Sequence, residues 1–138
     1  MSVLGLMALV QAALGGAAGP VDFRREIRPL LAERCFACHG PDEAARKAKL
    51  RLDSAEGATA ERKNGAAIVP GEPERSALLA RITARDAEER MPPADSGKQA
   101  LDAHEQELLR RWIAAGARYE THWAWTAPRS SALPAVRD

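Results

Sequence analysis

Five residues, Cys35-Phe36-Ala37-Cys38-His39, constrain this chain more than any other stretch of its sequence. Cys35 and Cys38 are the only cysteines, and a histidine directly follows the second one. On one helical turn, two thiols three positions apart can each add across a vinyl group of haem, while the next residue brings an imidazole under the iron. The spacing therefore predicts covalent attachment of haem c through Cys35 and Cys38, with His39 as the proximal axial ligand.

Three other uses of a Cys-x-x-Cys pair remain open, and the rest of the sequence weighs against each. A four-ligand zinc site needs further thiolate or imidazole donors, but His104 and His122 stand far apart and have no cysteine near them. A thioredoxin-like dithiol needs a strand before the motif, whereas the preceding segment has a helical pattern. Unliganded cysteines are uncommon in an exported chain. We therefore expect haem c and no zinc.

The N-terminus has the composition of an export signal. Val3 to Ala18 is a small and apolar stretch, interrupted only by Gln11, without a charged side chain. It is too short to span a bilayer comfortably, so we predict a signal peptide or apolar leader over residues 1–19. The missing Lys or Arg at its start keeps an ordinary apolar helix, packed on the domain, as the alternative. Since c-type attachment is associated with the far side of the cytoplasmic membrane, we expect an exported protein, periplasmic or membrane-anchored and facing the periplasm.

Charge excludes one class of partner. The chain has 20 Lys and Arg against 19 Asp and Glu, and the two signs are interspersed. Without a basic stripe, we expect no nucleic-acid binding.

The remaining sequence predicts helices joined by long loops. The first is expected over 23–36, with Asp22 as its N-cap, and Pro29 is expected either to kink this helix or to set back its true start. A second is expected over 73–83, and residues 55–69 between them are expected to form a loop. The third begins with a capping box, Asp102 and Glu105. Its apolar stripe and C-terminal stop comprise Leu108, Leu109, Trp112, Ile113 and Gly116.

A second axial ligand is expected from Met91, which is the only methionine outside the predicted leader. Pro92 and Pro93 follow it, and their fixed φ angles stiffen the loop that would hold the thioether toward the iron. His104, His122 and an open sixth position stay as alternatives. Arg51, which lies between His39 and Met91 in the sequence, is either available to a haem propionate or simply solvated.

Several segments together resemble the planctomycete-type cytochrome c domain, a class I cytochrome c-like family. The resemblance implies an all-α fold of three or more helices and long loops around one covalent haem c, with an N-terminal helix that crosses the C-terminal one. It also implies His39 and Met91 as axial ligands. The segments that carry it are Val21 to Leu31, Cys35 to Asp42, Leu50 to Asp53, Ile68 to Gly71, Met91 to Pro93 and Trp112 to Ala117.

The sequence thus predicts a haem domain over residues 20–118 that transfers electrons and converts no substrate itself. A redox partner protein, or a fused domain, is expected to dock at the haem edge. Residues 119–138 form an aromatic and proline-containing tail, or a linker to a domain absent from this chain. The alternatives are a redox module within a larger exported oxidoreductase or hydrolase, and a haem sensor or peroxidase-like protein with an open sixth site.

Overall fold

The computed structural model describes residues 19–120, so residues 1–18 of the predicted leader, His122 and nearly all of the tail lie outside the described residues. Within this range the chain is helical and has no strand, which confirms the predicted all-α class. No helix of the described part is long and apolar enough to cross a membrane. The five α-helices are α1 (Arg28–Arg34), α2 (Phe36–His39), α3 (Ala55–Thr59), α4 (Ala77–Ile82) and α5 (Ala103–Ala114).

The first helical segment begins where the sequence predicts, but it is not a single α-helix. The Asp22 carboxylate accepts hydrogen bonds from the backbone N–H groups of Arg24 and Arg25, at 2.9 and 3.0 Å. One π-helical turn, Phe23–Ile27, follows before α1. Pro29 lies in the first turn of α1, next to the junction with this π-helical turn. The predicted end at Phe36 is wrong, because the helix ends at Arg34 and Cys35 separates it from α2.

The last helix agrees with its prediction. The Asp102 carboxylate accepts from the Glu105 N–H at 2.8 Å, and the Glu105 carboxylate accepts from the Asp102 N–H at 2.9 Å, which is the predicted capping box. After Ala114 the chain turns at Gly116, whose φ of 101° is left-handed backbone that suits glycine.

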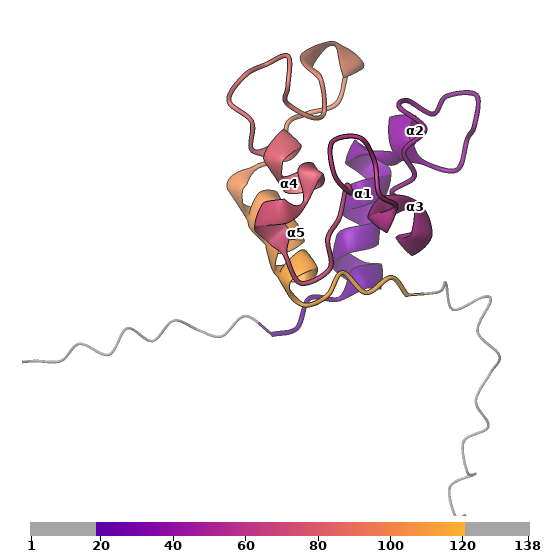
Figure 1. Ribbon diagram of the computed structural model, residues 1–138. Coiled ribbons are helices and arrows are strands. Elements are labelled where there is room, and N and C mark those ends of the chain that lie inside the picture. The colour runs from indigo at the N-terminus through magenta and orange to yellow at the C-terminus, as the bar shows by residue number, and fades with distance from the viewer. Residues whose placement is uncertain (1–18, 121–138) are drawn as a thin grey trace, which may run out of the picture.

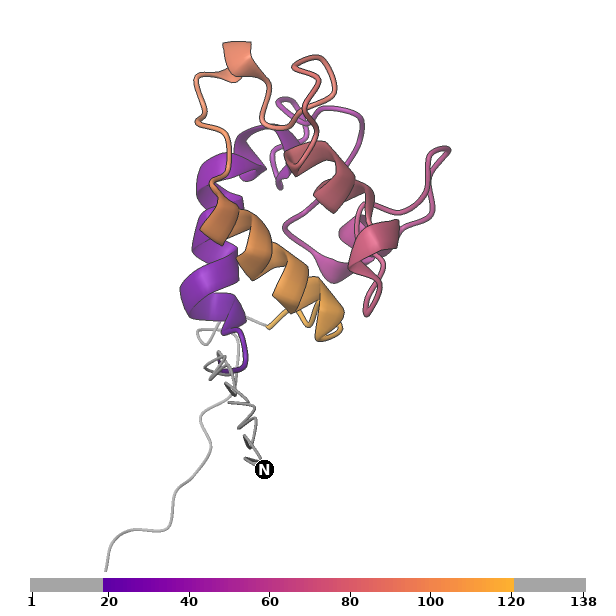
Figure 2. The ribbon, with the colours of Figure 1, turned by 90° about the vertical axis from the view of Figure 1, so that its left-hand side faces the viewer.

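Helix α5 packs against the first helical segment, as the two views of Figures 1 and 2 show. The rings of Phe23 and Trp112 stack with their centroids 5.6 Å apart. Tyr119 completes this cluster, with centroids 5.0 Å from Phe23 and 5.2 Å from Trp112. Burying a side chain such as Leu or Ile contributes about 1.5–3 kcal/mol, and these two segments supply four fully buried residues of the core: Ile27, Leu31, Leu109 and Ile113.

One ion pair joins the end of α1 to the beginning of α5. The Arg34 guanidinium lies 3.0 Å from the Glu105 carboxylate, and both side chains are largely buried. Glu105 therefore serves the capping box with one oxygen and Arg34 with the other. Because Cys35 follows Arg34, this pair fixes the start of the Cys-x-x-Cys-His motif relative to α5.

Two expectations about the middle of the chain are corrected. The loop predicted over 55–69 contains α3, because Ser54 accepts a hydrogen bond from the Gly57 N–H at 3.2 Å and caps that helix. The helix predicted over 73–83 divides into a 3-10 turn, Pro73–Arg75, and α4. Between these two, the buried Ser76 hydroxyl donates to the Glu72 carbonyl at 3.0 Å and accepts from the Val69 N–H at 2.9 Å.

The capping box gives a stability prediction. Asp102→Ala removes the acceptor for the Glu105 N–H, and we expect the free energy of unfolding to fall by about 1 kcal/mol. Asp102→Asn is the matched control, because an asparagine caps nearly as well, and it should stay close to the parent protein. Denaturant unfolding followed by far-UV circular dichroism measures both. Equal stability of the alanine variant and the parent protein would contradict the capping role.

Candidate cofactor pocket

The two cysteines and the histidine of the motif lie on one tight helical turn. The Cys35 carbonyl accepts hydrogen bonds from the N–H groups of Cys38, at 3.1 Å, and His39, at 2.8 Å. The two thiols are free and not joined in a disulfide. Both cysteines and the histidine are half-buried and line the same pocket. The turn therefore presents two thiols and an imidazole to one cavity.

This pocket has a volume of about 450 Å³ and a predominantly apolar lining. The motif forms one wall, and Ala77, Leu78 and Ile82 of α4 contribute apolar side chains to the lining. Leu50 and Leu52, from the loop after the motif, add further apolar surface. The cavity thus offers an apolar ligand a place beside two thiols and an imidazole.

Met91 lines the same pocket as His39, although the two residues are far apart in the sequence. The Met91 N–H donates to the Arg81 carbonyl at 3.0 Å, which ties the methionine to the end of α4. Pro92 is buried, follows a cis peptide bond, and also lines the pocket together with Pro93. The structure therefore brings together all four residues predicted for the site: Cys35, Cys38, His39 and Met91.

Of the two alternative axial ligands, only His104 lies among the described residues, and it does not line this pocket. His104 is exposed in the first turn of α5 and is not among the lining residues. Arg51 does not line the pocket either. Its guanidinium binds both oxygens of the Asp53 carboxylate, at 3.1 and 2.6 Å, and holds the pKa of Asp53 below its ordinary value.

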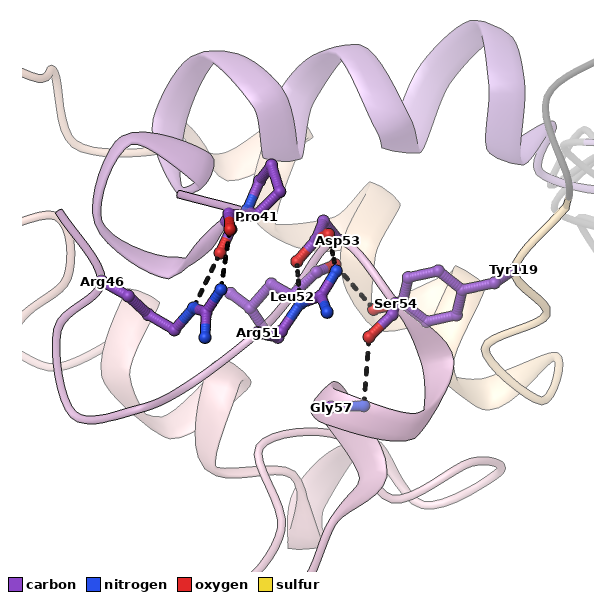
Figure 3. Close-up of polar contacts among 9 residues, drawn as sticks. Pro41, Arg46, Arg51, Leu52, Asp53, Ser54, Gly57 and Tyr119 are labelled. Atoms are coloured by element: carbon purple, nitrogen blue, oxygen red, sulfur yellow. Dashed lines mark hydrogen bonds and ion pairs between the residues drawn. The ribbon is translucent and has the colours of Figure 1, made fainter. Parts of the chain in front are cut away.

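The loop that follows the motif, residues 40–52, folds back onto the motif backbone and is called here the post-motif loop. The Lys47 N–H donates to the Cys38 carbonyl at 2.7 Å, and the Leu52 N–H donates to the His39 carbonyl at 2.8 Å. Arg46 donates to the carbonyls of Gly40 and Pro41, at 3.0 and 2.7 Å (Figure 3). These bonds close a loop directly behind His39.

The far end of the post-motif loop is attached to the aromatic cluster. The Tyr119 hydroxyl donates to the Leu52 carbonyl at 3.0 Å, as Figure 3 shows. Burial raises the pKa of Tyr119, so the hydroxyl keeps the proton that it donates. The contact between α5 and the first helix is thereby linked to the backbone beside His39.

Sequence reasoning missed the part that Arg62 plays in this loop. Its guanidinium donates to the carbonyls of Ala48, at 2.9 Å, and Lys49, at 2.6 Å. Ala48 and Lys49 have φ angles of 50° and 53°, so the backbone of the post-motif loop is left-handed at these two positions. No local pattern in the sequence indicates a bond between a side chain and a carbonyl thirteen or fourteen positions away.

The electrostatics of His39 suit a metal ligand. Burial lowers the pKa of the imidazole, the backbone of Lys47 acts in the opposite direction, and the charge of Arg62 lowers the pKa further. A lowered pKa keeps the ring neutral to more acidic pH, and only a neutral imidazole nitrogen can bind a metal. The Nδ1 atom is buried and has no hydrogen-bond partner among residues 19–120.

The cysteines differ from those of a dithiol oxidoreductase. Burial raises the pKa of the Cys35 thiol to about 12. A redox-active or zinc-binding cysteine needs a thiolate that is stable near neutral pH, whereas thioether formation leaves no charge on the sulfur. The environment of Cys35 therefore favours a neutral sulfur over a thiolate.

The charged residues of the pocket lining are all cationic. Five arginines and lysines contribute, and no Asp or Glu does: Arg34, Arg62, Lys63, Arg81 and Lys98. The chain as a whole has a net charge of only +1. The pocket therefore concentrates positive charge beside an apolar cavity, an arrangement that suits an apolar ligand with anionic groups.

Comparison with known proteins identifies the segment that forms this pocket. The family model described as Planctomycete cytochrome C matches residues 35–95, from the first cysteine to just beyond Met91. Comparison with curated proteins and with solved structures gave no match. The resemblance noted in the sequence, and the cytochrome c-like all-α fold that it implies, are confirmed over this segment.

A cytochrome c domain implies covalently bound haem c and haem-based electron transfer. The pocket fits this group on three grounds: two free thiols and an imidazole share one turn, the remaining lining is apolar, and the buried Nδ1 leaves Nε2 as the ring nitrogen for a metal. Haem is an apolar plate with anionic substituents, which is the ligand type that this lining favours.

The turn after His39 gives a second prediction. A Cβ on Gly40 would collide with the Phe36 carbonyl oxygen of the motif turn. Because that neighbour is backbone, Gly40→Ala must displace the turn itself. We expect a loss of about 1–3 kcal/mol in the free energy of unfolding and a lower yield of haem-loaded protein.

Glu43→Ala is the control for this substitution, since it changes an exposed side chain of the post-motif loop. Denaturant unfolding and the haem-to-protein absorbance ratio measure both variants. Parent-like values for Gly40→Ala would show that the turn tolerates a side chain.

Proposed function

We propose that this chain, whose residues 35–95 match the planctomycete cytochrome c family, transfers electrons through a haem c held by Cys35, Cys38, His39 and Met91. One observation carries the proposal. The structure brings the two thiols, the imidazole and the only methionine of residues 19–120 to the lining of a single apolar pocket.

Each of the four residues has a distinct role in this proposal. The thiols of Cys35 and Cys38 add across two vinyl groups, so that each S–H is consumed and no oxidant is needed. The His39 imidazole supplies the proximal nitrogen, and the post-motif loop behind it restricts its movement. Met91 supplies a thioether as the second axial ligand, and such a Met/His pair raises the reduction potential relative to two imidazoles.

When bound, haem supplies an iron that cycles between its ferric and ferrous states, one electron at a time. The protein sets the potential through burial, through the axial ligands and through hydrogen bonds around them. The Lys47 backbone, which raises the pKa of His39 against the effect of burial, is the group best suited to accept the proton of Nδ1. We assign no conversion of a substrate to this domain.

We also propose that the protein acts outside the cytoplasm, since the leader composition and c-type attachment support export together. The partner is a protein or a fused domain that docks at the pocket rim. The exposed Lys63 and the half-buried Lys98, both in the lining, favour a partner with an acidic surface.

Axial ligation by Met91 is testable by optical spectroscopy of the haem-loaded protein. The ferric form should show the weak far-red band that arises from sulfur-to-iron charge transfer, and Met91→Ala should lose it. Removing the thioether should also lower the reduction potential. His104→Ala, at an exposed histidine outside the pocket, should keep both properties.

Two results would oppose this assignment. A far-red band that persists in Met91→Ala would place the sulfur ligand elsewhere. Carbon monoxide binding to the reduced parent protein, without denaturant, would favour a sensor or peroxidase-like protein with an open sixth site. Covalent attachment is tested separately by denaturing electrophoresis. The parent protein should retain haem on the gel, and the double variant Cys35→Ala/Cys38→Ala should retain none.

The docking proposal predicts a salt effect. The rate of reduction by a small acidic redox protein should fall as ionic strength rises, because screening weakens attraction between opposite charges. Lys63→Glu/Lys98→Glu should lower that rate at low salt by about tenfold or more. Arg28→Glu, an exposed reversal on α1 that does not line the pocket, is the control. Equal rates for the double variant and the control would place docking on another face.

A further inference from the structure

We infer that Tyr119 is a positioning residue for the proximal ligand His39, and that it acts through the backbone of Leu52. The inference deepens the proposed function and rests on it, because it concerns a haem iron held by His39. Tyr119 is the first residue of the predicted tail and lies outside the segment that matches the cytochrome c family, residues 35–95. The inference therefore gives the chain after α5 a part in the site.

Two hydrogen bonds in series join Tyr119 to His39. The Tyr119 hydroxyl donates to the Leu52 carbonyl at 3.0 Å (Figure 3), and the Leu52 N–H donates to the His39 carbonyl at 2.8 Å. Both distances are those of well-formed hydrogen bonds. The first bond joins residues 67 positions apart in the sequence, so it connects the end of the domain to the backbone of the proximal ligand.

Leu52 also belongs to the pocket itself. Its side chain is only 3% exposed and is part of the apolar lining. The Tyr119 hydroxyl thus holds both the backbone that bonds His39 and an apolar side chain of the pocket wall. Without this hydroxyl the Leu52 carbonyl lacks its donor, and a buried carbonyl without a donor is costly. The backbone at Leu52 then turns toward another donor and carries the His39 carbonyl with it.

Tyr119 can act in this way because its own place is fixed. Its ring packs against Phe23 and Trp112, with centroids 5.0 and 5.2 Å away. The Trp112 indole N–H donates to the Arg118 carbonyl at 3.2 Å, and an ion pair at 2.9 Å holds Glu120 to the first helical segment. The residues on both sides of Tyr119 are therefore attached to the helix pair, and the hydroxyl is a preorganised donor.

The hydroxyl of Tyr119 keeps its proton over the ordinary pH range. Burial raises the pKa of Tyr119, and the negative charge of Asp53 raises it further. Both oxygens of the Asp53 carboxylate bind the Arg51 guanidinium, at 3.1 and 2.6 Å. The hydroxyl is therefore a constant donor to the Leu52 carbonyl and not a group that titrates.

The test is a proton NMR comparison of Tyr119→Phe with the parent protein, both loaded with haem and in the ferric form. The hyperfine-shifted methyl signals of ferric haem depend on the orientation of the axial imidazole about its bond to the iron. Phenylalanine keeps the ring in the aromatic cluster and removes only the hydroxyl. We expect the methyl signals to shift in Tyr119→Phe, because release of the Leu52 backbone changes the orientation of His39.

Two controls place the effect at His39. Thr59→Val also removes a hydroxyl that donates to a backbone carbonyl, at 2.9 Å, but this bond lies within α3. Its methyl signals should stay at the parent positions. The far-red band of the sulfur-to-iron charge transfer should persist in Tyr119→Phe, since the Met91 backbone is bonded to the end of α4 and not to Leu52.

The outcomes separate this inference from the proposed function. Parent positions of the methyl signals in Tyr119→Phe, even with a lower melting temperature, would overturn the positioning role and leave a purely structural bond. Loss of the far-red band in Tyr119→Phe would place the effect at Met91 and overturn the assignment to His39. Absence of covalent haem from the parent protein would overturn the proposed function, and this inference with it. Shifted methyl signals in Tyr119→Phe, with the band retained and Thr59→Val like the parent, would support both.

Discussion

Contact between the first helical segment and α5 determines where every other part of this domain lies. Phe23, Trp112 and Tyr119 form one aromatic cluster, and the Arg34–Glu105 ion pair closes the other end of the same contact. The cysteine motif follows Arg34 directly. A covalent site needs a fixed platform, because its reactive atoms must stay within a fraction of an ångström of their positions. This helix pair is that platform.

The pocket opposite the platform is built from loops and very short helices. α2, α3 and α4 have four, five and six residues, and such helices are not stable alone in water. Hydrogen bonds between distant residues hold these short helices and loops in place. The Leu52 N–H bonds the His39 carbonyl, Tyr119 bonds the Leu52 carbonyl, and Arg62 holds the carbonyls of Ala48 and Lys49.

The sequence predicted best what depends on neighbouring residues. The capping box at Asp102, the N-cap at Asp22 and the stop at Gly116 are local patterns, and all three are present. The motif and Met91 were predicted from the chemistry of their side chains, and the structure brings them to one pocket. Features that depend on distant contacts were missed. The left-handed pair at Ala48 and Lys49 is held by Arg62, and the helix over 73–83 is interrupted by the bonds of Ser76 to a preceding loop.

The buried thiol of Cys35 has a consequence for the order of events during biosynthesis. Its pKa of about 12 means that almost none of it is thiolate at neutral pH once the fold is closed. The thiolate is the reactive form of cysteine. Attachment of the cofactor is therefore favoured while the chain is still open, and folding around the attached group follows. The sulfur that folding then buries is a thioether, which forms no thiolate and takes no part in exchange with other thiols.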